Sequence, residues 1–122
     1  MKIDFDKITY GDGHGNPFNH FKNIYYDGRY IGRNFVKSSF LTYNEKTVIY
    51  FSGSPWLTSE QVALLESSGC VKDDSAECKE SDYPWMKSFD NNETAAILWW
   101  GAMIDALGLD LDYHYPVTDS QI

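Results

Sequence analysis

The longest apolar stretch of the chain covers residues 93–107, where the sequence reads ETAAILWWGAMIDAL. Asp105 is the only charged residue in its last thirteen positions, so the pattern predicts a helix that is apolar almost all the way round. Asp90, followed by Glu93, has the spacing of an N-terminal capping box, and Gly108 favours a left-handed C-terminal cap. Such a helix must be buried on more than one side, so we expect it to be the centre of the core.

The helical period divides this segment into two apolar faces and one mixed stripe. We expect the two apolar faces to be buried, and they consist of Ile97, Trp100, Ile104 and Leu107, and of Ala95, Trp99, Ala102 and Ala106. We expect only the stripe to meet water, and it consists of Thr94, Leu98, Gly101 and Asp105. The pair Trp99 and Trp100 is therefore interpreted first as core packing.

The first half of the chain alternates apolar and polar positions in a way typical of antiparallel strands. The predicted strands cover residues 3–10, 21–26, 29–36, 40–43 and 47–51. Asp27 followed by Gly28 between two aromatic runs predicts a tight hairpin turn. A second hairpin is predicted with its turn at residues 44–46.

The second half begins with a shorter helix after Pro55. Thr58 and Gln61 have the spacing of a capping box, and Gly69 is expected to end the helix. Residues 69–92 show no periodicity, and we expect in them a short helical turn after Pro84. Residues 109–115 alternate strictly enough to predict a closing strand, with residues 116–122 as a tail.

This order of elements predicts an α+β fold. We expect an antiparallel sheet of about four to six strands with two helices, of which the C-terminal one, at about 93–107, is central and buried. Residues 1–122 are long enough to form a single domain with its own core. Its expected parts are a strand-rich segment (1–53), a helical segment with a long acidic loop (54–108), the closing strand (109–115) and the tail (116–122).

The charge is unevenly distributed along the chain. The net charge of −8 divides into +2 for residues 1–56 and −10 for residues 57–122. Since no basic footprint stands out, direct binding of DNA or RNA is not expected. The longest apolar run is too short to cross a bilayer, and the first ten residues lack a signal-peptide pattern, so a cytoplasmic location is predicted.

The sequence carries no motif that fixes a reaction, so no enzymatic activity, cofactor or metal is predicted. Gly11, Gly13 and Gly15 lack the remaining residues of a phosphate-binding loop. Asp12, His14 and His20 could form a metal cluster, although surface histidines are the more common reason for such spacing. Cys70 and Cys78 are expected as free thiols, and a disulfide between them is left open.

Residues 70–92 combine carboxylates with aromatic side chains, which is typical of a surface that binds a basic protein partner. We therefore expect a non-enzymatic acidic inhibitor that blocks a nucleic-acid-handling enzyme, such as a nuclease, a toxin or a defence effector. Toxin immunity proteins and phage anti-CRISPR or other anti-defence proteins act in this way, in some cases by nucleic-acid mimicry. The predicted contact residues are Asp73, Asp74, Glu77, Glu80, Asp82, Tyr83 and Trp85.

Two other functions are compatible with the sequence. The first is a small-molecule or nucleotide-binding domain with an aromatic pocket between sheet and helix. Its expected walls are Tyr25, Tyr26, Trp99 and Trp100. The second is self-association as a homodimer, through the apolar helix or an exposed strand edge.

Overall fold

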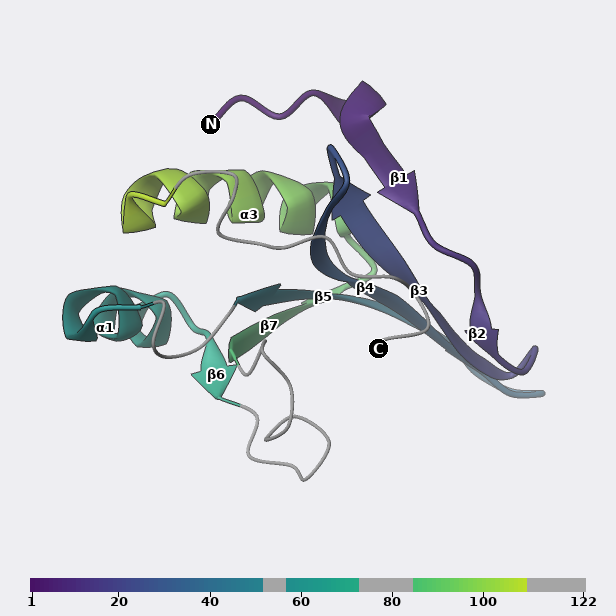
Figure 1. Cartoon of the computed structure of the whole chain (residues 1–122). Helices are drawn as coiled ribbons and strands as arrows, with labels where there is room; N and C mark the ends of the chain where they lie inside the picture. The colour runs from purple at the N-terminus through teal and green to yellow at the C-terminus, as the bar shows by residue number, and fades with distance from the viewer. Residues whose placement is uncertain (52–56, 73–84, 110–122) are drawn as a thin grey trace.

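A computed structural model of the chain describes residues 1–51, 57–72 and 85–109. These residues form one antiparallel sheet with a long helix packed against it (Figure 1). The predicted α+β class is therefore confirmed. The sheet is somewhat larger than expected, since it has seven strands when two very short ones are included.

The strands follow the order β1-β3-β4-β5-β7-β6 across the sheet, with β2 paired to β3 outside this path. All these pairs are antiparallel, and their strands are β1 (Ile8–Tyr10), β2 (His14–Gly15), β3 (Asn19–Tyr26), β4 (Arg29–Ser38), β5 (Tyr43–Phe51), β6 (Val71–Lys72) and β7 (Trp85–Asp90). A 3-10 turn η1 (Phe5–Lys7) precedes β1, and the described α-helices are α1 (Ser59–Ser67) and α3 (Glu93–Leu107).

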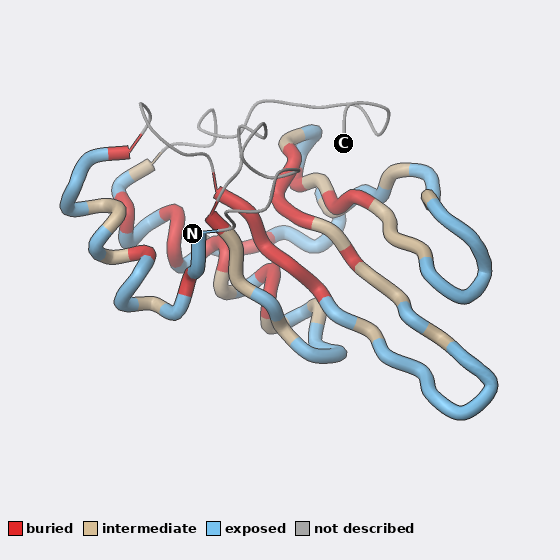
Figure 2. The backbone as a smooth tube through the Cα atoms, turned by 90° about the horizontal axis from the view of Figure 1, so that it is seen from below, coloured by how far each residue is buried: buried red, intermediate tan, exposed pale blue. Residues whose placement is uncertain are grey.

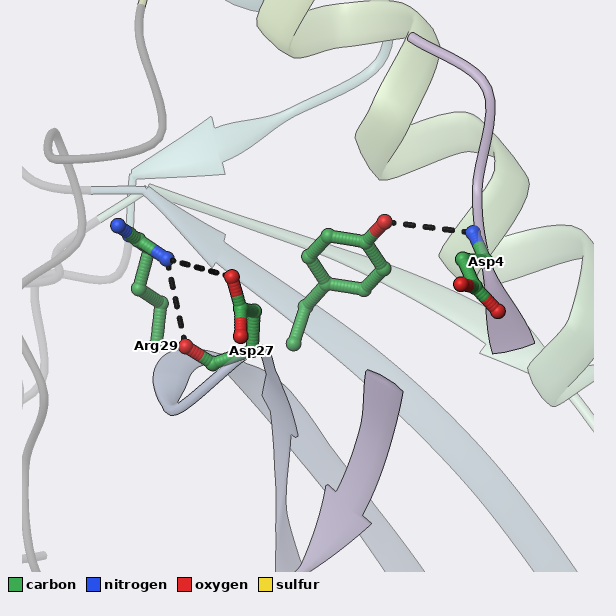
Figure 3. Close-up of polar contacts among 4 residues, drawn as sticks. Asp4, Asp27 and Arg29 are labelled. Atoms are coloured by element: carbon green, nitrogen blue, oxygen red, sulfur yellow. Dashed lines mark hydrogen bonds and ion pairs between the residues drawn. The ribbon is translucent and has the colours of Figure 1, made fainter. Parts of the chain in front are cut away.

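The turn between β3 and β4 is the one that Asp27 and Gly28 predict. Both residues have positive φ angles, of 50° and 81°, as a tight hairpin turn with two left-handed central residues requires. Arg29 holds the turn, because its Nη1 donates to the Asp27 carbonyl at 3.3 Å and to the Asp27 carboxylate at 3.5 Å (Figure 3). Local chemistry alone is sufficient to place this hairpin.

The predicted second hairpin is wrong. Residues 44–46 do not turn but continue β5, where they pair with Lys37, Val36 and Phe35 of β4. The turn lies earlier, at residues 39–42, where the Ser39 N–H donates to the Thr42 carbonyl at 2.7 Å and the Thr42 N–H donates to the Ser39 hydroxyl at 3.1 Å. A serine hydroxyl can form such a turn without glycine or proline, which explains why the sequence pattern missed it.

The helical turn expected after Pro84 is also wrong, because residues 85–90 form strand β7. Trp85, Lys87 and Phe89 alternate with Met86, Ser88 and Asp90 along the strand. This period of two puts the first set on the same face of the sheet as α3, since Trp85 lies opposite Phe51 and Phe89 opposite Thr47. β7 thus extends the sheet to cover the start of α3.

The start of α3 differs from the prediction, whereas its end agrees with it. Asn92 is the N-cap, and its side-chain oxygen accepts from the Ala95 N–H at 3.0 Å. Asp90, the expected cap, is the last residue of β7, so the chain needs two further residues to turn into the helix. Gly108 takes the left-handed conformation with φ 68°, as predicted.

α3 is buried on two sides. The predicted apolar face of Ile97, Trp100, Ile104 and Leu107 is buried against the sheet. The second predicted face is only partly right, because Ala102 and Ala106 are exposed, whereas Ala96 and Met103 are buried. Gly101, which was expected on the stripe that meets water, is buried as well. A Cβ atom at Gly101 would lie 2.8 Å from Cδ1 of Ile3, so the missing side chain lets the N-terminal segment lie directly on the helix.

The N-terminal segment is bonded to both of the elements beside it, helix α3 and strand β3. The amino group of Met1 forms an ion pair with Asp105 of α3. The backbone N–H of Asp4 donates to the hydroxyl of Tyr26 in β3 at 3.3 Å (Figure 3). This segment therefore provides the second wall that an almost wholly apolar helix needs.

α1 begins at the predicted capping box, in which both hydrogen bonds between Thr58 and Gln61 are present. The Gln61 amide also donates to the Leu107 carbonyl at the end of α3, at 2.8 Å. At the other end, Lys87 of β7 donates to the Ser68 carbonyl at 2.8 Å, where a cation is favourable near the last carbonyls of a helix. These two bonds tie α1 to α3 and to the sheet.

The two faces of the sheet differ in what covers them. α3 packs on the covered face, where Ile24, Tyr26, Ile31, Ile49 and Phe51 join the main core. The opposite face carries a smaller cluster of Tyr30, Val48 and Tyr50, to which neither α1 nor α3 contributes. We call this opposite face the open face, because neither of the two described α-helices packs on it. The exposed ends of the long strands extend away from the buried centre of the molecule (Figure 2).

Candidate functional site

Six of the seven predicted contact residues lie outside the described residues: Asp73, Asp74, Glu77, Glu80, Asp82 and Tyr83. Trp85 is described, and it begins β7 with only 8% of its surface exposed. Its ring belongs to the main core. In the free protein Trp85 therefore stabilises the fold, and a direct contact with a partner stays a prediction.

The four aromatic residues expected to line a pocket between sheet and helix do not come together. Tyr26 packs on Trp100 with ring centroids 5.2 Å apart, and both side chains are buried in the core. Trp99 lies beside Phe51 and Phe89, with ring centroids 5.7 Å and 5.5 Å away. Tyr25 belongs to the open face, so it cannot share a pocket with the helix.

A cleft with a volume of about 510 Å³ lies instead on the open face, towards the exposed ends of the long strands. Its walls come from four adjacent strands, β2, β3, β4 and β5. The lining residues are His14, Gly15, Asn19, His20, Phe21, Phe35, Val36, Lys37, Asn44 and Lys46. None of these residues carries a carboxylate.

The floor of the cleft is a row of rings that the strand register places side by side. Phe21 lies opposite His14 on one neighbouring strand and opposite Phe35 on the other. The His14 and Phe21 rings stack with centroids 5.1 Å apart, and Phe21 and Phe35 are 5.7 Å apart. Each of these three side chains is only partly buried, so the row presents an aromatic surface to the cleft.

Cations surround this aromatic row. The Arg33 guanidinium lies 4.6 Å from the centre of the Phe21 ring, and its Nε donates to the Asn23 side chain at 3.2 Å. Lys37 and Lys46 are exposed at the rim. Lys46 has a carboxylate neighbour, Asp90, at 3.9 Å, in a pair that is largely exposed and therefore weak. The cleft is thus locally basic within a chain of net charge −8.

Beyond the cleft, the strands end in an exposed apolar cluster that we call the hairpin tip. Phe40 is 99% exposed and Leu41 86% exposed in the turn between β4 and β5, and Tyr43 follows at 68%. Phe18, at 61%, lies next to them, because the Ser38 N–H donates to its carbonyl at 2.6 Å. The tip consists of Phe18, Phe40, Leu41 and Tyr43. Large apolar side chains gathered in this way are typical of an interaction site.

Two tyrosine hydroxyls interact with carboxylates, and one of them belongs to the hairpin tip. The Tyr43 hydroxyl donates to Glu45 at 3.2 Å, and this bond raises the pKa of Tyr43. Partial burial, together with a hydrogen bond to Glu93, raises the pKa of Tyr10 to about 12. Both phenols are therefore neutral at physiological pH, and Tyr43 adds no negative charge to the hairpin tip.

The described residues do not support a metal site or a membrane-spanning helix. Within residues 1–51, 57–72 and 85–109, no three His, Cys, Asp or Glu side chains gather closely enough to hold a metal ion. His14, one of the candidate ligands, instead stacks on Phe21. None of the helices described is long and apolar enough to span a membrane.

Cys70 is a buried free thiol, and Cys78 lies outside the described residues. Burial raises the pKa of the Cys70 thiol to about 11, an effect that the nearby Lys87 ammonium partly opposes. Since only the thiolate is nucleophilic, we expect iodoacetamide at about pH 8 to alkylate Cys70 roughly a hundredfold more slowly in the folded protein than in denaturant. Peptide mass spectrometry follows Cys70 alone, with glutathione as the reagent control. Equal rates in the two states would contradict the buried position of this thiol.

Sequence reasoning missed both the cleft and the hairpin tip. The cleft depends on Tyr43–Phe51 forming one strand, whereas sequence reasoning divided this segment between two strands and a turn. The signal for the tip was the pair Phe40 and Leu41 next to two serines, in a segment assigned to a strand. No protein-family model matches this chain, and comparison with curated proteins and with solved structures also found no match.

Proposed function

We propose that this protein is a non-enzymatic inhibitor that binds and blocks a basic, nucleic-acid-handling enzyme, such as a toxin nuclease or a defence effector. The observation that carries the proposal is the hairpin tip, where Phe40 and Leu41 are 99% and 86% exposed. Burial of a phenylalanine or leucine side chain contributes roughly 1.5–3 kcal/mol, and in the free protein this contribution is not realised. A partner protein that covers the tip would realise it.

The position of the tip supports insertion into a cleft of the partner. It lies where β4 and β5 turn, at the exposed end of paired strands that extend beyond the core (Figure 2). The strands are held in a continuous ladder from Ser38 and Tyr43 back to Gly32 and Ile49, so the tip is presented on a paired support. A preorganised apolar element loses little conformational freedom on binding, which favours affinity.

The charge of the second half supports a basic partner. Residues 57–122 carry a net charge of −10, and such a field accelerates association with a positively charged surface. An enzyme that handles nucleic acid has a positive cleft for the phosphate backbone. In this proposal the carboxylates Asp73, Asp74, Glu77, Glu80 and Asp82, together with Tyr83, contact the rim of that cleft, and the hairpin tip provides the apolar anchor.

Capture from the native cytosol at low salt tests the proposal. We expect the immobilised protein to retain a nucleic-acid enzyme that elutes at moderate salt, because the electrostatic contribution is screened. Reversal of three charges, by Asp73→Lys, Asp74→Lys and Glu77→Lys, is expected to slow association with that enzyme about tenfold or more at low salt.

The matched control reverses three acidic residues elsewhere, at Asp4, Asp6 and Glu60, all exposed. This control has the same net charge as the first variant, so a difference between the two measures the local effect of residues 73–77. Equal association rates for the two variants, or indifference of both to salt, would contradict steering by the acidic segment.

A second function is favoured by a specific observation, the cleft of the open face. Binding of a small molecule or nucleotide there does not depend on the inhibitor proposal. Self-association is a third hypothesis, in which a second copy would cover the hairpin tip, and light scattering of the purified chain distinguishes it from capture of a different protein.

A further inference from the structure

The cleft of the open face is not needed for the core, and the inhibitor proposal does not use it. We propose that this cleft binds a nucleoside phosphate. The base lies against the aromatic surface formed by His14, Phe21 and Phe35, and the phosphate lies between the ammonium groups of Lys37 and Lys46. The volume of about 510 Å³ is within the range of pockets that hold small ligands.

The aromatic surface is suited to a planar ring. His14, Phe21 and Phe35 come from three adjacent strands, and their successive centroids are 5.1 Å and 5.7 Å apart. A base that stacks on an accessible face of one of these rings gains about 1–3 kcal/mol, whatever its identity. The Arg33 guanidinium lies over the Phe21 ring, 4.6 Å from its centre, and so adds positive charge next to the lining of the cleft. The aromatic row alone would accept any flat apolar ligand.

The two lysines at the rim of the cleft favour an anionic ligand. Lys37 has no ion-pair partner in the part of the chain that the structure describes, and Lys46 shares only a long, exposed pair with Asp90. None of the described residues that line the cleft carries a carboxylate that would compete for them. Asn19 and Asn44 add carboxamides at the same rim, and these can donate to and accept from the edge of a base. Rings, amides and cations together match a nucleoside phosphate.

The charge of the whole chain favours a small ligand over a nucleic-acid strand. A long polyanion would meet the field of a protein with net charge −8, whereas a nucleotide in the cleft responds to charges nearby. At physiological ionic strength, exposed charges act over about 8 Å, so a ligand in the cleft responds first to the lysines of its rim. The expected occupant is therefore a mononucleotide.

Isothermal titration calorimetry with AMP, GMP, CMP and UMP tests the proposal. We expect saturable binding of the purine nucleotides in the micromolar to millimolar range, with tighter binding than for the pyrimidine nucleotides because a larger ring stacks more surface. Adenosine and inorganic phosphate, tested separately, are each expected to bind at least about tenfold more weakly than AMP. This comparison separates stacking from charge.

Single substitutions show which residues bind the phosphate of the ligand and which bind its base. Lys37→Gln and Lys46→Gln are each expected to weaken AMP binding about tenfold with little change for adenosine. Phe21→Leu is expected to weaken both ligands by a similar factor, and its melting temperature shows that the sheet is intact. Lys22→Gln is the matched control, because Lys22 lies on the same strand but alternation puts its side chain on the other face, over the Tyr10 ring at 4.2 Å.

Several outcomes would overturn the proposal. The first is that no saturable binding is seen at millimolar AMP, and the second is that inorganic phosphate binds as tightly as AMP. The third is that Lys22→Gln and Lys37→Gln lose the same amount of affinity for AMP. If oligonucleotides bound more tightly in proportion to their length, the cleft would belong to a surface that binds single-stranded nucleic acid, and it would not be a mononucleotide site. Phe40→Ser at the hairpin tip is expected to leave AMP binding unchanged, so failure of the inhibitor proposal and failure of this one remain distinguishable.

Discussion

Replacement of Phe40 and Leu41 by serine is expected to weaken binding to the captured enzyme by about a hundredfold or more. The two side chains are 99% and 86% exposed in the free protein, so their removal leaves no cavity in the fold. If both become buried in the complex, each is worth roughly 1.5–3 kcal/mol, and 1.4 kcal/mol corresponds to a tenfold change in affinity. Surface plasmon resonance of the double variant measures this loss, which should appear mainly in the dissociation rate.

The control for this variant is Leu98→Ser. Leu98 is a large apolar residue that is 49% exposed on α3, away from the turn between β4 and β5. We expect it to leave the affinity within about twofold, and we expect both variants to melt within about 3 °C of the parent chain. If Phe40→Ser with Leu41→Ser bound as tightly as the parent chain, the tip would not be an anchor and the proposed binding mode would be wrong.

Trp100→Ala is expected to produce the largest loss of stability of any single substitution. Trp100 is fully buried, it packs on Tyr26 at 5.2 Å, and it lies at the centre of the helix that covers the sheet. Truncation of a buried tryptophan costs about 3–5 kcal/mol, through lost burial and the cavity left behind. For a chain of 122 residues this corresponds to a fall in melting temperature of about 10 °C or more.

Differential scanning calorimetry measures this effect, and Trp99→Ala provides the comparison. Trp99 is only partly buried, so its truncation should lower the melting temperature by roughly half as much. Equal effects at the two positions would contradict the assignment of Trp100 to the centre of the core.

The parts of the fold that sequence reasoning predicted correctly rest on local chemistry. Asp27 and Gly28 form their turn because both can take positive φ, and Thr58 with Gln61 caps α1 through bonds between neighbours. Gly108 ends α3 for the same kind of reason. In each case the residues that determine the structure lie within a few positions of one another.

The errors arose where distant residues decide the structure. Residues 44–46 have turn-like composition, yet they extend β5 because the end of β4 and the end of β7 lie beside them. Residues 85–90 form a strand because β5 and β6 pair with them on either side. Tertiary pairing of this kind overrides local preference, and the sequence pattern alone does not contain it.

The candidate site was harder to predict from the sequence than the fold was. The cleft depends on the register that places His14, Phe21, Phe35 and Lys46 on adjacent strands, although up to 32 positions separate them in the chain. The charge asymmetry, in contrast, is visible directly in the sequence. Its combination with an apolar tip and a locally basic cleft became apparent only once the strands were paired.

The hairpin tip and the basic cleft both belong to the exposed part of the long strands, and the second half of the sequence carries a net charge of −10. An inhibitor with these features would use charge for the rate of association and apolar burial for the lifetime of the complex. The two contributions can be separated, because salt changes the first and the tip variant changes the second.

The most direct test of the inhibitor function is the activity of the captured enzyme during titration with this protein. Inhibition predicts that nucleic-acid cleavage or binding falls linearly and ends at a fixed stoichiometry, with Phe40→Ser and Leu41→Ser shifting the curve to about a hundredfold higher concentration. Full enzymatic activity in a complex that light scattering shows to be saturated would contradict the account, because the protein would then be a binding partner without being an inhibitor.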